Sequence, residues 1–217
     1  MKNSKTLVIV LGVLGIMAIC FATTGAIFAS MYNKPMTLKI NAEESMGNVA
    51  VMLQRQADVV TNAQAGFAQI SALDNAQVLG YVAEAKAIGG MLDPYCENGE
   101  CRLPEDPTER QQLLDAMANF DNSSRTFIAY VQTHAELRSA EVFDDMMVSI
   151  EGSANRVSTQ RLIMNGQIAD YKEHCVNFPG SFFCSMRGLT GNEFGFYEVE
   201  ESEEAAPTPG YPTPTLP

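Results

Sequence analysis

The sequence predicts an all-α protein, in which a single transmembrane helix is followed by an antiparallel up-and-down helical bundle. Two observations lead to this fold class. One long uncharged apolar run lies near the N-terminus, and apolar residues recur at helical spacing through three later stretches joined by short connections. With 217 residues, of which 46% are apolar, the chain has the length of one domain with appendages.

The uncharged run extends from Leu7 to Ala29 and follows a short basic N-terminus at residues 1–6. Its 23 residues exceed the roughly 20 that a helix needs to span a bilayer. A cleaved secretory signal is the alternative, because residues 24–26 resemble a small-residue cleavage site. The apolar part of a signal peptide, however, stops at about 7 to 15 residues. We therefore expect residues 7–29 to be an uncleaved single-pass anchor.

Charge predicts the orientation of this anchor. Lys2 and Lys5 precede the apolar run, whereas the chain after Ala29 holds the other 12 basic residues and all 26 acidic ones. The positive-inside rule therefore favours a cytoplasmic N-terminus and an exported body, although Lys34 and Lys39 just past the run oppose it. The acidic body also excludes nucleic acid as a partner, because such binding needs a basic surface.

The body is predicted at residues 36–197. Pro35 is expected to break or restart the helix that leaves the anchor, because proline lacks a backbone donor and clashes with the preceding turn. Beyond it, apolar residues recur at helical spacing from Met36 to about Ile88, which predicts the first long helix. The Gly- and Pro-rich residues 89–107 are predicted to form a loop.

Two further long helices are expected, at about residues 107–137 and 140–177. Both carry apolar residues at alternating gaps of four and three, the spacing of a coiled-coil seam. Pro179 and Gly180 end the last of them, and a short aromatic segment after Ser181 is a candidate fourth helix. Three long helices with short connections predict an antiparallel bundle.

The last stretch, residues 198–217, is an acidic cluster followed by a Pro- and Thr-rich tail. It holds too little apolar surface to offset the entropy lost on folding. We expect an extended, disordered tail.

Four cysteines follow the anchor: Cys96, Cys101, Cys175 and Cys184. An even number in an exported domain predicts two structural disulfides. A zinc site is the alternative, but its ligands are usually spaced more closely in both halves. The predicted bundle puts the loop after the first helix and the end of the third helix together, far from the anchor, so local pairing and cross-pairing are both open. We favour local pairing, because short loops close at little entropic cost.

Three polar residues are predicted to form a layer across the bundle: Asp74, Ser124 and Arg161. Counted from the far end of its predicted helix, each lies about 16 or 17 residues in, which is roughly 24 to 26 Å at the helical rise. We expect Asp74 to pair with Arg161, and Ser124 to hydrogen-bond nearby, so that the layer fixes helix register. The alternative is that Arg161 extends to solvent with its stem on the seam.

No reaction chemistry is apparent in the sequence. The two histidines, His134 and His174, fall on different helices, and neither has a nearby Ser or Cys arranged as nucleophile and base. The sequence lacks a phosphate-binding glycine loop and the Glu-x-x-His motifs of di-metal bundles. The sequence therefore predicts no enzyme, no catalytic or metal-binding residue and no cofactor.

Two stretches carry motifs of a known family. Residues 53–67, LQRQADVVTNAQAGF, have Asp58, Asn62 and Gly66 at signature positions, with Thr61 in place of a proline. In residues 151–180 the matching positions are Glu151, Gly152, Asn155, Arg156, Arg161, Asn165, Tyr171, Phe178 and Pro179, while Met164 and Lys172 depart from the pattern. The chain thereby resembles LemA proteins from the anchor to about Tyr197, with the cysteine loop and the tail outside the pattern.

The resemblance implies a single-pass bacterial membrane protein with a helical-bundle body and no enzymatic activity or cofactor. We therefore expect a membrane-anchored interaction or scaffold protein of the bacterial cell envelope that docks an unidentified protein partner. A ligand- or metal-sensing domain is the alternative function.

Small residues recur along one face of the anchor: Gly15, Ala18, Ala22, Ala26 and Ala29. Such a face lets membrane helices approach closely. The chain is therefore also a candidate homo-oligomer through its anchor.

Overall fold

A computed structural model of the protein describes residues 2–67, 76–134 and 141–197. Its elements are α1 (Lys2–Phe67), α2 (Ala76–Leu92), the 3-10 turn η2 (Asp93–Tyr95), β1 (Cys96–Glu97), β2 (Glu100–Cys101), α3 (Pro107–Thr133), α5 (Glu141–Val176) and α6 (Gly180–Met186). The predicted all-α class is confirmed, since the two short strands form the whole sheet of this part of the chain. The predicted tail at residues 198–217 and Asp74 lie outside the described residues.

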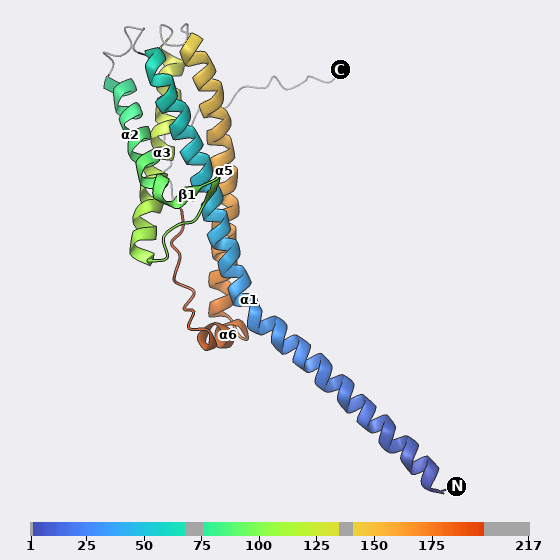
Figure 1. Ribbon diagram of the computed structural model, residues 1–217. Coiled ribbons are helices and arrows are strands. Elements are labelled where there is room, and N and C mark those ends of the chain that lie inside the picture. The colour runs from blue at the N-terminus through green and yellow to red at the C-terminus, as the bar shows by residue number, and fades with distance from the viewer. Residues whose placement is uncertain (1, 68–75, 135–140, 198–217) are drawn as a thin grey trace, which may run out of the picture.

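The helix α1 is continuous from Lys2 to Phe67, so the predicted break at Pro35 is wrong. A proline inside a helix removes one hydrogen bond and bends the axis, and a helix held on both sides by other contacts continues through it. Figure 1 shows α1 changing direction where it leaves the bundle and continuing alone to the N-terminus.

The first predicted body helix, Met36 to Ile88, is also wrong, because the structure has two helices there. One is the body part of α1, which ends at Phe67, and the other is α2, which starts at Ala76 and packs against α1. Apolar spacing is a local signal and does not register a reversal of the chain. Asp74 and Asn75, just before α2, are residue types that favour helix starts and carry the local signal for this break.

The body is therefore a bundle of four helices, α1, α2, α3 and α5, with α6 beside it (Figure 1). We call the end where α1 enters the bundle, around Lys34, the near end, and the end where α1 stops, at Phe67, the far end. The extra reversal changes the direction of every later helix. The end of α5 consequently lies at the near end, not at the far end as the sequence predicted.

Local residue chemistry explains the connection between α2 and α3. Asn98 and Gly99 both adopt positive φ angles, of 54° and 82°, which suits the tight turn joining β1 to β2. Asp106 begins α3 as its N-cap, since its carboxylate accepts hydrogen bonds from the backbone N–H groups of Thr108 and Glu109 at 2.9 Å each. Pro107 follows at the first helical position.

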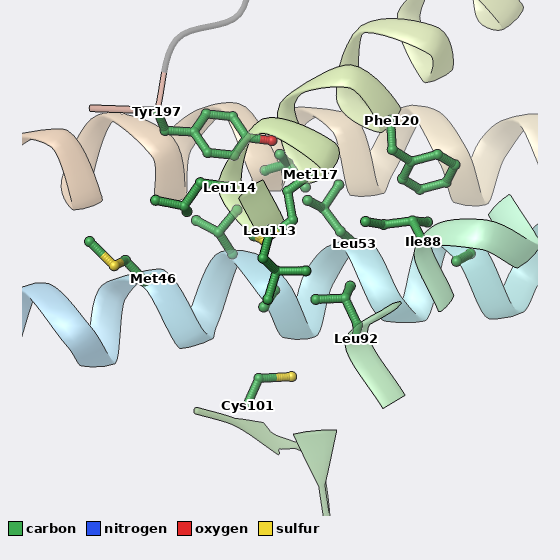
Figure 2. Packing of buried hydrophobic residues seen from close by; sticks show 14 of the residues in the cluster. Met46, Leu53, Ile88, Leu92, Cys101, Leu113, Leu114, Met117, Phe120 and Tyr197 are labelled. Atoms are coloured by element: carbon green, nitrogen blue, oxygen red, sulfur yellow. The ribbon is translucent and has the colours of Figure 1, made fainter. Parts of the chain in front are cut away.

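The core runs along the bundle axis and draws side chains from every body helix. Figure 2 shows part of it: Met46 and Leu53 of α1, Ile88 and Leu92 of α2, Cys101 of β2, and Leu113, Leu114, Met117 and Phe120 of α3. Tyr197 belongs to the same buried cluster although it lies after α6 in the chain. The residues after α6 therefore return along the bundle and complete the core.

The side chain of Asn165 on α5 fixes this returning segment. Its amide nitrogen donates to the carbonyl oxygen of Tyr197 at 3.0 Å, and its oxygen accepts from the Tyr197 N–H at 2.9 Å. Nearer α6, the hydroxyl of buried Tyr171 donates to the Glu193 carboxylate at 2.8 Å. Asn165 and Tyr171 of α5 thus hold the returning segment by hydrogen bonds at Tyr197 and Glu193.

Candidate functional site

The four predicted cysteines form two local disulfides, Cys96–Cys101 and Cys175–Cys184. The first joins the paired residues of β1 and β2, and the second ties the end of α5 to α6. The fifth cysteine, Cys20, lies exposed on α1 as a free thiol. In the described residues no group of three or more His, Cys, Asp and Glu side chains is placed to hold a metal ion.

The two disulfides lie at different heights along the bundle, so the premise behind cross-pairing is wrong. The β-hairpin Cys96–Cys101 packs against α1 at Gly47, where a Cβ atom would overlap the carbonyl oxygen of Cys101. The Cys175–Cys184 disulfide joins the end of α5 to α6, and these two elements meet at the near end (Figure 1). The extra helix reversal explains this separation.

Ser124 belongs to a buried hydrogen-bond chain across three helices. Gln56 of α1 donates to the Tyr81 hydroxyl at 3.3 Å, Tyr81 of α2 donates to Ser124 at 3.0 Å, and Ser124 donates to the Phe120 carbonyl at 2.7 Å. Such a chain aligns the helices that contribute to it. Gln56 and Tyr81 could not be predicted as partners of Ser124, because an isolated polar residue in a helix carries no sequence signal for its partner.

Arg161 is half-buried and lies near a different acid, Asp121 of α3. Burial raises the pKa of Asp121, and the positive charges of Arg125 and Arg161 partly oppose that rise. Arg125 approaches the Asp121 carboxylate at 3.4 Å. The predicted Asp74–Arg161 pair stays a prediction. The predicted position of Arg161, 16 residues from the far end, is wrong, because it was counted back from the end of α5, and α5 ends at the near end.

The near end holds the candidate functional site. Its main part is the α6 segment, which we define as Val176–Met186 and which the Cys175–Cys184 disulfide closes. Gly180 begins α6, and a Cβ atom there would overlap the backbone oxygen of His174. The missing side chain lets α6 fold back closely against the end of α5.

Arg187, just after α6, ties this segment to α1. Its Nε donates to the carbonyl oxygen of Tyr32 and its Nη2 to the Asn33 side chain, both at 2.8 Å. Its guanidinium also lies over the Tyr32 ring, 4.2 Å from the centroid. These contacts occupy the turn just before Pro35, which explains how α1 stays ordered through the proline.

Phe183 of α6 continues the contact along α1 toward the N-terminus. Its ring meets that of Phe28 edge to face, with centroids 5.3 Å apart. Phe28 lies in the last turn of the uncharged run that ends at Ala29. The α6 segment therefore touches the apolar N-terminal part of α1 as well as the bundle.

A hollow of about 410 Å³ lies between α1, α5 and α6, lined by Lys34, Leu38, Asp170, Glu173, His174 and the turn at residues 177–180. Burial and the neighbouring Lys34 lower the pKa of His174. The buried Nε2 of this ring has no hydrogen-bond partner among the described residues. The hollow mixes one cation with two acids, and it favours neither an anionic nor a cationic ligand.

Comparison with known protein families settles the family. The LemA family model matches residues 45–209, which is more than half of the chain. The chain belongs to the LemA family. The predicted resemblance is thus confirmed, and the match reaches beyond its expected limits to cover the cysteine loop and the first part of the tail, while it starts after the anchor. The same comparisons find no match among curated proteins or among solved structures.

Proposed function

We propose that this LemA family protein is a membrane-anchored interaction or scaffold protein of the bacterial cell envelope. One observation carries the proposal: every side chain from Leu11 to Ala29 is exposed, although this part of α1 is apolar. α1 contains a segment long and apolar enough to cross a membrane, and none of it is buried against the bundle. A lipid bilayer is the environment that covers such a helix.

Charge and cysteine chemistry support an exported body. Lys2 and Lys5 precede the apolar segment, and all 26 acidic residues follow it. Two disulfides fit an oxidising compartment outside the cytoplasm. In this arrangement the body lies on the outer side of the cell membrane, and the helix α1 runs without a break from the anchor into the core of the body.

The interaction role rests on the form of the body. α1 contacts α2, α3, α5 and α6, and the anchor belongs to this same continuous helix. The outer face of α5 presents large apolar side chains, with Leu162 exposed to 69% and Val148 to 70%. Exposed apolar side chains on a rigid helix suit a docking surface for a protein partner, and self-association through the small-residue face of the anchor stays a prediction.

Membrane extraction tests the anchor. Changing Ile16 and Ile19 to Lys places two charges in the apolar segment, each costing about 3 kcal/mol in a bilayer centre. We expect alkaline carbonate to release this variant from membranes and to leave the wild-type protein in them. The matched control changes Leu162 and Ile163, exposed on α5, to Lys and is expected to stay in the membrane. Release of the wild-type protein contradicts the proposal.

Site-directed photo-crosslinking in living cells tests the docking role. A crosslinker at Leu162 or Val148 should give the same discrete adduct in repeated experiments, and the adduct should disappear when Ile16 and Ile19 are Lys. A metal bound in stoichiometric amount to the purified full-length protein, together with no adduct, would instead favour the sensing function.

A further inference from the structure

The α6 segment exposes four large apolar side chains within eleven residues of sequence. The exposed fractions are 74% for Val176, 87% for Phe178, 54% for Phe182 and 52% for Met186. Large apolar groups gathered at one end of a molecule mark a contact with a protein or a membrane. The Cys175–Cys184 disulfide joins the end of α5 to α6 and so restricts the conformations of the loop between them.

The contacts of α6 give its height relative to the anchor. Phe183, the neighbour of Phe182, packs on Phe28 in the last turn of the apolar run. The rings of Phe182 and Phe183 are in turn 5.4 Å apart and edge to face. A chain of aromatic contacts therefore connects exposed Phe28 of the anchor, through buried Phe183, to exposed Phe182 of the α6 segment.

The polar groups one turn farther along α1 mark a boundary. Tyr32 stacks under Arg187, and Lys34 follows two residues later. Aromatic residues with polar groups, together with Arg and Lys, concentrate at the headgroup level of membrane proteins. Phe28 and Phe183 lie about 6 Å below this level, which is four residues at the helical rise.

We propose that the α6 segment lies in the boundary between headgroups and acyl chains of the bilayer that the anchor crosses, with Phe178 and Phe182 in lipid. The proposal rests on the proposed function, because it needs Leu7–Ala29 to span a membrane. A phospholipid surface is the occupant, since the acyl chains that would surround Phe28 lie beside Phe183, whose ring contacts the half-exposed ring of Phe182. Short apolar segments bind interfaces at a depth of about 5 to 10 Å.

The chain offers a direct test because it contains no tryptophan. Three full-length single-tryptophan variants are compared in vesicles of phosphatidylethanolamine and phosphatidylglycerol: Phe182→Trp in α6, Phe21→Trp in the anchor and Val148→Trp toward the far end. Phe21 and Val148 are exposed to 74% and 70%, so both changes keep the packing intact. Quenching is measured with lipids brominated either near the carbonyl end or near the methyl end of the acyl chain.

We expect shallow bromines to quench Phe182→Trp by at least half and more strongly than deep bromines. Phe21→Trp should show the opposite order, and Val148→Trp should be quenched only by aqueous iodide. Phe178→Trp serves as a second reporter if far-UV circular dichroism shows that Phe182→Trp is misfolded.

The outcomes separate the two proposals. Quenching of Phe21→Trp without quenching of either α6 reporter overturns the interfacial position of α6 and leaves the anchor intact; it would point to a protein partner or a second copy on this surface. Absence of lipid quenching at Phe21→Trp contradicts the proposed membrane anchor. It then contradicts the interfacial position of α6 as well, because that position requires the anchor.

Discussion

The two disulfide-closed segments of this protein, the β-hairpin Cys96–Cys101 and the α6 segment, present opposite surfaces. The residues between the hairpin cysteines are Glu97, Asn98, Gly99 and Glu100, all exposed and polar or without a side chain. The residues exposed around α6 include Phe178 and Phe182, which are large and apolar. Both segments nevertheless pack against α1 through a glycine or a ring contact.

A disulfide thus fixes the conformation of a short segment, whereas the other side chains of the segment decide whether water or an apolar environment suits it. In the hairpin the disulfide holds a turn that water already solvates well. In the α6 segment it holds apolar rings outward, in a position that water alone does not favour. The disulfide therefore stabilises a polar turn in the hairpin, whereas in the α6 segment it stabilises a conformation that exposes apolar side chains.

Removing the two disulfides is expected to have the largest effects. Cys175→Ser with Cys184→Ser should lower the free energy of unfolding by about 2.5 kcal/mol, and Cys96→Ser with Cys101→Ser by about 2 kcal/mol, from closing loops with sequence separations of 9 and 5. Denaturant titration of the full chain in detergent, followed by circular dichroism, measures both.

The free thiol supplies the control for these variants. Cys20→Ser makes the same chemical change at an exposed position and should leave stability unchanged. Hydrogen exchange in α6 should accelerate only in the variant that lacks Cys175 and Cys184. Equally fast hydrogen exchange in α6 of the variant that lacks Cys96 and Cys101 would contradict the expectation that each disulfide stabilises only its own segment.

The two close-packed glycines give the next effects. Gly180→Ala places a methyl group against the His174 backbone oxygen, and Gly47→Ala places one against the Cys101 backbone oxygen. Backbone atoms cannot rotate away, so each change should cost about 1 to 2 kcal/mol of unfolding free energy. Gly152→Ala on α5 has open space around its Cβ position and should instead stabilise the helix by up to about 1 kcal/mol. Equal melting temperatures for all three variants would refute close packing at both segments.

Arginine substitutions should give the smallest and most local effects. Arg187→Lys keeps the charge but loses the forked donors to Tyr32 and Asn33, and it should cost about 1 kcal/mol. Arg102→Lys, exposed beside the hairpin, is the matched change and should be neutral. Faster hydrogen exchange around Pro35 and α6 in Arg187→Lys alone is the expected readout. Unchanged exchange there would show that Arg187 does not hold α1 to α6.

Local chemistry predicted much of the fold. The predicted second helix begins at about residue 107, where α3 starts at Pro107, and the predicted third helix corresponds to α5, because apolar spacing is set within a few residues. The chain reversal between Phe67 and Ala76 was missed, because the apolar spacing on both sides fits one helix. Asn98-Gly99 was a readable hairpin signal that the loop prediction did not use.

The candidate site was less predictable, because its position depends on that missed reversal. With three helices, Phe178 and Phe182 belong at the far end, where an apolar segment has no lipid beside it. With four, the α6 segment that carries them contacts Phe28 through Phe183. The contacts of Arg187 with Tyr32 and Asn33 span more than 150 residues of sequence, and no local pattern encodes such a pair.

The continuity of α1 limits where the body can meet a partner. The 33 residues from Pro35 to Phe67 rise about 50 Å, and no flexible linker separates them from the anchor. Under the proposed function, this continuity would keep the body in a layer along the membrane, within which it would diffuse in two dimensions. A partner of the kind proposed above would then have to be attached to the same membrane or reach into this layer, so its surface density, rather than its concentration in bulk solution, would govern the encounter.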